Sequence, residues 1–116
     1  MGYSEELLDR NLHPMYEGMM EDATFRRVVV NSSCGDKMIV FLKISEEGVV
    51  TDARWEGYGC AVSQASADLM AERVIGKKVE EVRRMRWEDV PELEGVRRMP
   101  ARGKCAGLSW GVLGEI

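Results

Sequence analysis

Residues 49–76 read VVTDARWEGYGCAVSQASADLMAERVIG and contain the point at which the sequence changes from strand-like to helix-like. Residues 49–56 have the character of a β-strand, whereas residues 61–75 contain neither Gly nor Pro. The apolar residues of the second half recur at helical spacing: Val62, Ala65 and Leu69. The stretch therefore predicts a strand over 49–56 and a helix over 61–75 that is closed by Gly76, with Cys60 at the junction.

Two further strand-like runs precede this stretch. Residues 25–32 and 37–44 are rich in β-branched and other large apolar side chains, which favour strands. The short connection at 45–48 ends in a glycine and is suited to a hairpin between the second run and residues 49–56. Three consecutive strands with short turns predict an antiparallel meander.

Helices are predicted on either side of these strands. Ser4 is suited to cap a first helix, which Pro14 ends because a proline disfavours helical geometry in the residue before it. A short helix is expected over 78–86 and a last one over 101–113. Strands grouped before helices predict the α+β class, a three-stranded antiparallel sheet packed against helices. A length of 116 residues fits a single domain, 1–116.

The composition excludes two kinds of partner. No apolar run reaches the length of a membrane span and the N-terminus is acidic, which predicts a cytoplasmic protein without a membrane partner. Residues 73–104 carry ten Lys and Arg against six Asp and Glu, within a chain of net charge −4. Only Trp87 adds an aromatic ring to that stretch, so we expect a mixed solvated surface and no nucleic-acid binding.

Three cysteines are the first candidates for chemistry: Cys34, Cys60 and Cys105. An odd number cannot pair completely within the chain, and a reducing compartment disfavours disulfides. Glycines beside or near each thiol allow close approach of the backbone to an ion. We expect Cys60 and Cys105 near helix starts, where the helix dipole favours the metal-binding thiolate. A buried core position is the alternative, and for Cys105 the two interpretations weigh equally.

Asp36 is a candidate fourth ligand, because it stands two residues beyond Cys34. Three thiolates and one carboxylate can complete a tetrahedron around Zn²⁺. The same four groups can anchor the two irons of a cluster, with oxygen in place of the usual fourth sulfur. The alternative for Asp36 is a turn residue that bonds its own backbone.

Three motifs resemble those of a known family, the iron–sulfur assembly scaffolds IscU, SufU and the N-terminal domain of NifU. NSSCGD at 31–36 is similar to the family's Asn-Pro-x-Cys-Gly-Asp, and GYGCAVSQAS at 57–66 to its Gly-x-Gly-Cys-x-x-Ser-x-Ala-Ser. ARGKCAGLSW at 101–110 resembles the third-cysteine segment of the SufU branch. The motifs occur in order and use all three cysteines, and the resemblance extends over nearly the whole chain.

The resemblance implies a three-stranded antiparallel sheet covered on one side by helices, with the ligands converging at one tip. The implied ligands are Cys34, Asp36, Cys60 and Cys105, and the implied cargo is a transient 2Fe-2S cluster or, alternatively, Zn²⁺. The implied function is that of a scaffold, not an enzyme, which receives sulfur from a cysteine desulfurase and passes the cluster to recipient apo-proteins. Cys105 is the implied persulfide acceptor, an assignment that its neighbours Arg102 and Lys104 also favour.

The sequence departs from both branches of the family. Ser32 replaces the family's proline, and Lys104 stands where the IscU branch has a histidine. The Leu-Pro-Pro-Val-Lys stretch of that branch is also absent, which points toward the zinc-bound, sulfur-accepting SufU proteins. The SufU branch, however, usually carries an insertion between its second and third cysteines, and this chain is too short there. The branch stays open.

Two further functions compete with the scaffold and the zinc-bound sulfur acceptor. The first is a thiol-nucleophile enzyme that uses Cys60 or Cys105, but the single histidine, His13, lies in an N-terminal loop and no acid–base pair is evident. The second is a structural zinc module. We expect Asp36 to be exposed, which fits a transfer site better than a structural ion.

Overall fold

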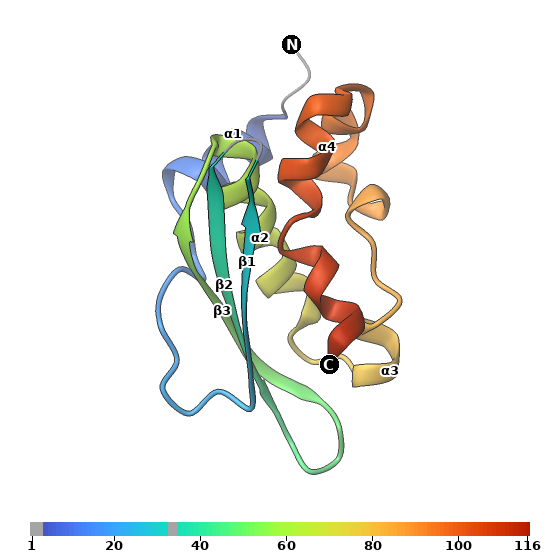
Figure 1. The fold of residues 1–116 in the computed structure, drawn as a ribbon. Helices are drawn as coiled ribbons and strands as arrows, with labels where there is room; N and C mark the ends of the chain where they lie inside the picture. Colours follow the sequence, from blue (N-terminus) through green and yellow to red (C-terminus); the bar gives the residue numbers. More distant parts are fainter. Residues whose placement is uncertain (1–3, 33–34) are drawn as a thin grey trace.

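The computed structural model describes residues 4–32 and 35–116. After the N-terminal helix the three strands follow one another and helices make up the second half, as the α+β prediction requires (Figure 1). The elements in chain order are α1 (Glu5–Leu12), β1 (Phe25–Asn31), β2 (Asp36–Ile44), β3 (Val50–Tyr58), α2 (Ala61–Val74), α3 (Val79–Val82), the 3₁₀ helices η1 (Trp87–Asp89) and η2 (Pro91–Arg98), α4 (Pro100–Gly107) and the 3₁₀ helix η3 (Trp110–Glu115).

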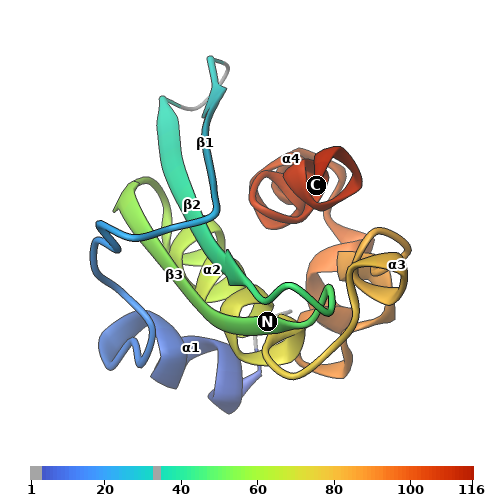
Figure 2. The ribbon, with the colours of Figure 1, turned by 90° about the horizontal axis from the view of Figure 1, so that it is seen from below.

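The described strands form one antiparallel sheet in the order β1-β2-β3, which confirms the predicted meander. Alternate side chains of β2 and β3 point to one face and are completely buried: Met38, Val40, Leu42, Ala53 and Trp55. Helices α2, α3 and α4 lie on one side of the sheet (Figure 2). The free edge of β3 is covered by the N-terminal segment, because Trp55 exchanges backbone hydrogen bonds with Tyr16 and Gly18.

Helix α2 is the centre of the molecule. Ten of its 14 residues are buried, so it presents almost no face to solvent. The predicted apolar face is confirmed, since Val62, Ala65 and Leu69 are all buried. The buried set also includes three polar side chains: Ser63, Ser66 and Asp68. A buried polar group needs a hydrogen-bond partner, so each of these side chains constrains what packs beside it.

Asp68 fastens the N-terminal segment to α2. Its carboxylate accepts hydrogen bonds from the backbone N–H groups of Met15 and Tyr16, the shorter at 2.7 Å. It also accepts one from Trp55 Nε1 at 2.9 Å and forms an ion pair with Arg10 at 3.0 Å. One buried carboxylate thus joins α1, the segment that follows it and the central face of β3.

The local predictions are most accurate where they rest on residues that cap or end a helix. Ser4 caps α1 by accepting a hydrogen bond from the N–H of Leu7, and the helix ends two residues before Pro14. The helix predicted over 78–86 is confined to α3. The helix predicted over 101–113 is wrong as a single element, because α4 ends at Gly107 and η3 begins at Trp110. None of the helices in the described ranges is long and apolar enough to cross a membrane.

We predict that Asp68→Asn lowers the free energy of unfolding by about 3 kcal/mol, because it removes a buried charge that pairs with Arg10 and leaves amide donors badly matched. Urea unfolding followed by circular dichroism measures the loss. Glu56→Gln, at an exposed position of β3, is the control and should change stability by less than about 0.5 kcal/mol. Equal stability of the two variants would contradict the anchoring role.

Candidate metal centre

The candidate ligands come from three elements that meet at one end of the sheet. Asp36 is the first residue of β2, and Cys60 is the N-cap of α2, directly after β3. Cys105 lies in α4, which runs alongside at the same end of the molecule (Figure 1). The sequence brings the first two together through the β2–β3 pairing, since Lys37 lies opposite Tyr58.

The ligand atoms of Asp36, Cys60 and Cys105 all lie within 4.8 Å of one another. Ligands about 2.3 Å from a tetrahedral Zn²⁺ would be roughly 3.8 Å apart, so small side-chain movements bring this group to binding distance. One carboxylate and two thiols also suit zinc or iron by chemical type. Cys34, the remaining predicted ligand, lies outside the described residues, so its convergence stays a prediction.

Asp36 is buried, with 1% of its surface exposed, which corrects the expectation of an exposed side chain. Its Oδ1 accepts a hydrogen bond from the backbone N–H of Cys60 at 3.1 Å. Its Oδ2 accepts one from the hydroxyl of Ser63 at 2.8 Å. The carboxylate therefore satisfies donors at the start of α2, and this negative charge at a helix N-terminus is favourable. It is a hydrogen-bond acceptor at the start of α2, supplied by another element, as well as a candidate ligand.

Cys60 has the electrostatic environment that favours a thiolate. Burial raises the pKa of its thiol, but hydrogen bonds with the backbone and side chain of Ser63, with the Cys105 thiol and with the Val62 backbone together have a larger opposite effect, so the pKa lies below its ordinary value. The Sγ of Cys60 is 3.6 Å from the hydroxyl oxygen of Ser63. The prediction that Cys60 stands at a helix start is confirmed.

Cys105 lies elsewhere in its helix than predicted. It is the sixth of the eight residues of α4, in the last turn, where the helix dipole disfavours a thiolate. The helix-start argument for the most stabilised thiolate therefore applies to Cys60 and not to Cys105. Cys105 is also buried, so both earlier interpretations hold in part: it is a core residue whose sulfur faces the other candidate ligands.

Gly59, Gly103 and Gly107 lie against side chains of other elements. A Cβ on Gly59 would lie 2.6 Å from Oδ1 of Asp36, so only glycine lets the carboxylate reach the start of α2. Gly103 and Gly107 instead face the indole of Trp87, and a Cβ on Gly107 would lie 2.9 Å from its Nε1. The interpretation that Gly103 allows backbone approach to an ion is replaced by packing against Trp87.

The roles of Ser63, Ser66 and Trp87 were not among the predictions from the sequence. Ser66 donates a hydrogen bond to the carbonyl oxygen of Ala106 at 2.6 Å, and Nε1 of Trp110 donates one to Ser66 at 2.9 Å. One feature of the sequence could have indicated the roles of the two serines. Ser63 and Ser66 stand in a predicted helix among mostly apolar neighbours, where a polar side chain needs a hydrogen-bond partner.

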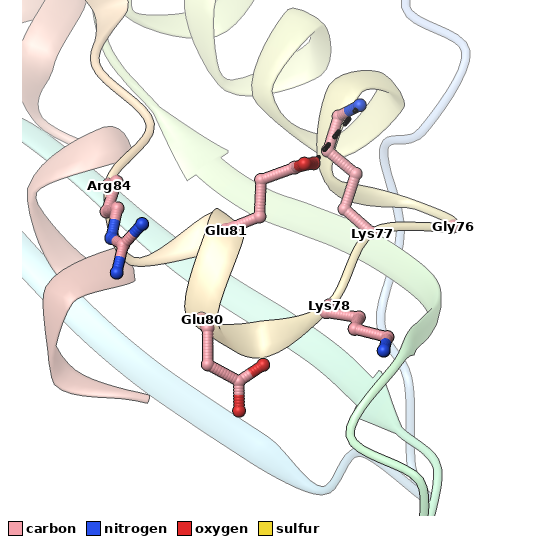
Figure 3. Close-up of a pocket in the computed structure, with 6 residues that line it drawn as sticks. All are labelled: Gly76, Lys77, Lys78, Glu80, Glu81 and Arg84. Atoms are coloured by element: carbon pink, nitrogen blue, oxygen red, sulfur yellow. Dashed lines mark ion pairs between the residues drawn. The ribbon is translucent and has the colours of Figure 1, made fainter.

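A surface pocket of about 490 Å³ lies away from these residues. It is lined by residues of and around α3: Gly76, Lys77, Lys78, Glu80, Glu81 and Arg84 (Figure 3). Lys77 and Glu81 form an ion pair across it, with N and O atoms 3.7 Å apart. The lining offers charges of both signs and no thiol, so the thiol-bearing end of the sheet is the better candidate for the function.

The antiparallel sheet, the helices on one side of it and the carboxylate–thiol group at its end define a small α+β protein with a thiol-rich candidate metal centre. The family model described as the NifU-like N terminal domain matches residues 2–115. The chain belongs to this family, as its three motifs predicted.

Relatives of known name agree with this assignment. The chain is 40% identical to the iron–sulfur cluster assembly scaffold protein IscU of Thermotoga maritima, over 99% of this chain and 92% of that protein. It is 32% identical to the zinc-dependent sulfurtransferase SufU of Bacillus subtilis, over 96% of this chain and 86% of that protein.

Solved structures show the same fold. A protein from Fervidobacterium islandicum described as an iron–sulfur cluster assembly scaffold for the SUF system superposes with a TM-score of 0.85 at 29% identity, covering 97% of this chain and 94% of that one. The N-terminal part of a NifU-like protein from Brucella abortus gives 0.80 at 28% identity, covering 97% and 89%. The predicted sheet-and-helix architecture of this family is therefore confirmed.

We predict that Gly59→Ala displaces the Asp36 carboxylate and lowers the free energy of unfolding by about 1–3 kcal/mol, because the added methyl group overlaps Oδ1. Thermal unfolding of the metal-free protein measures the effect. Gly111→Ala is the matched control, since a Cβ there meets nothing within 4 Å. If Gly59→Ala were no less stable than Gly111→Ala, the close approach of Asp36 would not constrain the fold.

Proposed function

We propose that this chain, residues 1–116, is an iron–sulfur cluster assembly scaffold that holds iron and sulfide through Cys34, Asp36, Cys60 and Cys105. The convergence of the three described ligand atoms within 4.8 Å carries the proposal. The scaffold names of its relatives support it. In this role the protein receives, holds and passes on a 2Fe-2S cluster as cargo and is not an enzyme.

The mixed ligand set suits temporary storage. Thiolates hold iron firmly, whereas a carboxylate is a harder ligand that exchanges more readily. Asp36 also has a second stable arrangement, because its oxygens accept hydrogen bonds from Cys60 and Ser63 at the start of α2. An oxygen that leaves the metal is therefore accepted by protein donors, which favours opening the site at this corner.

The partners follow from the chemistry of the cargo. A cysteine desulfurase supplies the sulfur, and recipient apo-proteins with free thiols take the cluster. Thiols that bind a metal must stay reduced, which a reducing compartment favours, so we propose a cytoplasmic location.

A second function is favoured by the same donor set. Two thiols and a carboxylate suit Zn²⁺ as well as iron, and one relative carries the name zinc-dependent sulfurtransferase. In this version the protein holds zinc and accepts sulfur as a persulfide, with Cys105 as the acceptor that the family resemblance implies. The two functions differ in the metal found in the protein.

We expect anaerobically purified protein to contain iron and acid-labile sulfide, and replacement of Cys34, Cys60 or Cys105 by Ser to weaken metal binding more than about 100-fold, because loss of a direct ligand exceeds the effect of an outer one. Metal and sulfide analysis with an absorption spectrum measures both. Ser32→Ala, an exposed position two residues before Cys34 in the sequence, is the control. Zinc without sulfide would favour the sulfur acceptor, and full binding by one Ser variant would remove that cysteine from the ligand set.

We predict that Asp36→Asn loads iron and sulfide but delivers them to an apo-ferredoxin more slowly. Asn keeps an oxygen for the amide of Cys60 while removing the charge, so an incoming thiol has no exchangeable carboxylate to displace. Transfer is followed by absorption, beside each protein's melting temperature.

The matched control is Asp68→Asn, which alters another buried carboxylate about 12 Å along α2 from Cys60. It should lower the melting temperature and leave transfer unchanged. Unchanged transfer by Asp36→Asn, together with a large fall in its melting temperature, would refute the exchangeable corner and favour a structural ion.

A further inference from the structure

Ser66 makes a hydrogen-bonded connection between the two helices that carry the described thiols. Its side chain is completely buried in α2, six residues after Cys60. Its hydroxyl donates to the carbonyl oxygen of Ala106 at 2.6 Å, and Ala106 directly follows Cys105 in α4. The connection therefore reaches α4 within one residue of the thiol.

The carbonyl of Ala106 needs this partner because of where α4 ends. The last four carbonyl groups of a helix receive no hydrogen bond from an N–H group of the same helix. Because α4 ends at Gly107, the carbonyl of Ala106 is one of these four. A buried carbonyl without a hydrogen-bond donor is destabilising. The hydroxyl of Ser66 provides the donor that the helix itself lacks at this position. The end of α4 is thereby tied to a specific point on α2.

Trp110 determines the direction of this bond. Its indole Nε1 donates to the hydroxyl oxygen of Ser66 at 2.9 Å. An indole N–H can only donate, so Ser66 must act as acceptor there and its single proton is left for Ala106. The order Trp110 to Ser66 to Ala106 is therefore set by the donor chemistry of its members.

Trp87 makes a second contact with α4. Its indole packs against Gly103 and Gly107, which lie one turn apart on a common face of α4. Cys105 stands midway between them in sequence and, at about 100° per residue, points from the opposite side of the helix. Trp87 therefore contacts α4 on the side away from Cys105, and Ser66 bonds the end of the same helix.

We propose that Ser66 is a positioning residue that sets the separation of the Cys60 and Cys105 thiols. Its hydroxyl bonds to the Ala106 carbonyl and to the Trp110 indole, and it acts by placing the end of α4 relative to the start of α2. The consequence for metal binding rests on the scaffold function proposed above. The thiol separation itself does not, because it is a property of the metal-free chain.

The first test measures that separation without any metal. In a Cys34→Ser background only Cys60 and Cys105 are left. Dibromobimane attaches first to the half-buried Cys60 and becomes fluorescent when it closes onto the neighbouring Cys105. We expect Ser66→Ala to slow this cross-linking several-fold while reaction of Cys60 with a monofunctional bimane changes little. The control is Asp68→Asn, because Asp68 fastens a different segment to the same helix. This variant should cross-link at the parent rate even though it is destabilised.

The second test uses Co²⁺ as the probe in the chain that keeps all three cysteines. The intensity of the sulfur-to-cobalt absorption reports the number of thiolate ligands, and we expect Ser66→Ala to bind Co²⁺ about 10- to 100-fold more weakly with lower intensity. Trp110→Phe, which removes only the donor that orients the hydroxyl, should shift both measurements in the same direction by less. It also provides the test if Ser66→Ala does not fold.

Cross-linking by Ser66→Ala at the parent rate, or an equal slowing in Asp68→Asn, would overturn the positioning role. Slower cross-linking in Ser66→Ala alone supports it, even if the parent protein binds no metal, and that combination would defeat the proposed scaffold function instead. Normal Co²⁺ binding by Ser66→Ala beside slow cross-linking would show that the ligands tolerate the displacement and would overturn the link to metal binding.

Discussion

The structure depends on the need to satisfy polar side chains of a helix that is buried on nearly all sides. Ser63, Ser66 and Asp68 of α2 have no access to solvent, so their hydrogen bonds must come from protein. Each one binds a different part of the chain: Ser63 the start of β2, Ser66 the end of α4 and Asp68 the segment after α1. A central apolar helix could pack in several orientations, whereas these directional bonds permit one.

The candidate metal centre is a product of the same constraint. The carboxylate of Asp36 belongs both to the packing of α2 and to the group of ligand atoms, and Cys60 stands at the point where the two meet. Stability and ligand exchange therefore share one side chain. In a scaffold, a ligand with an alternative partner inside the protein makes release possible without exposing an unpaired buried charge.

Prediction succeeded for features with a local physical cause. The strands follow from β-branched runs, the ends of α1 from Ser4 and Pro14, and the place of Cys60 from the abrupt change of pattern at that residue. It failed for Cys105, because the apolar spacing of the last segment continues across Ser109 while the chain turns there from α4 into η3. Asp36 was misjudged because hydrophilic neighbours in sequence say nothing of what covers a residue from other elements.

The sequence alone determined the class of the protein and the order of strands and helices, and it supplied the candidate metal ligands, because propensity, turn residues and ligand chemistry are properties of short segments. Only the tertiary structure decided that Asp36 is buried against the start of α2, that the glycines of α4 receive Trp87 and that Ser66 connects the two thiol-bearing helices. These facts arise from contacts between residues up to 44 positions apart, such as Ser66 and Trp110. Their geometry exists only once the sheet, α2 and α4 have packed together.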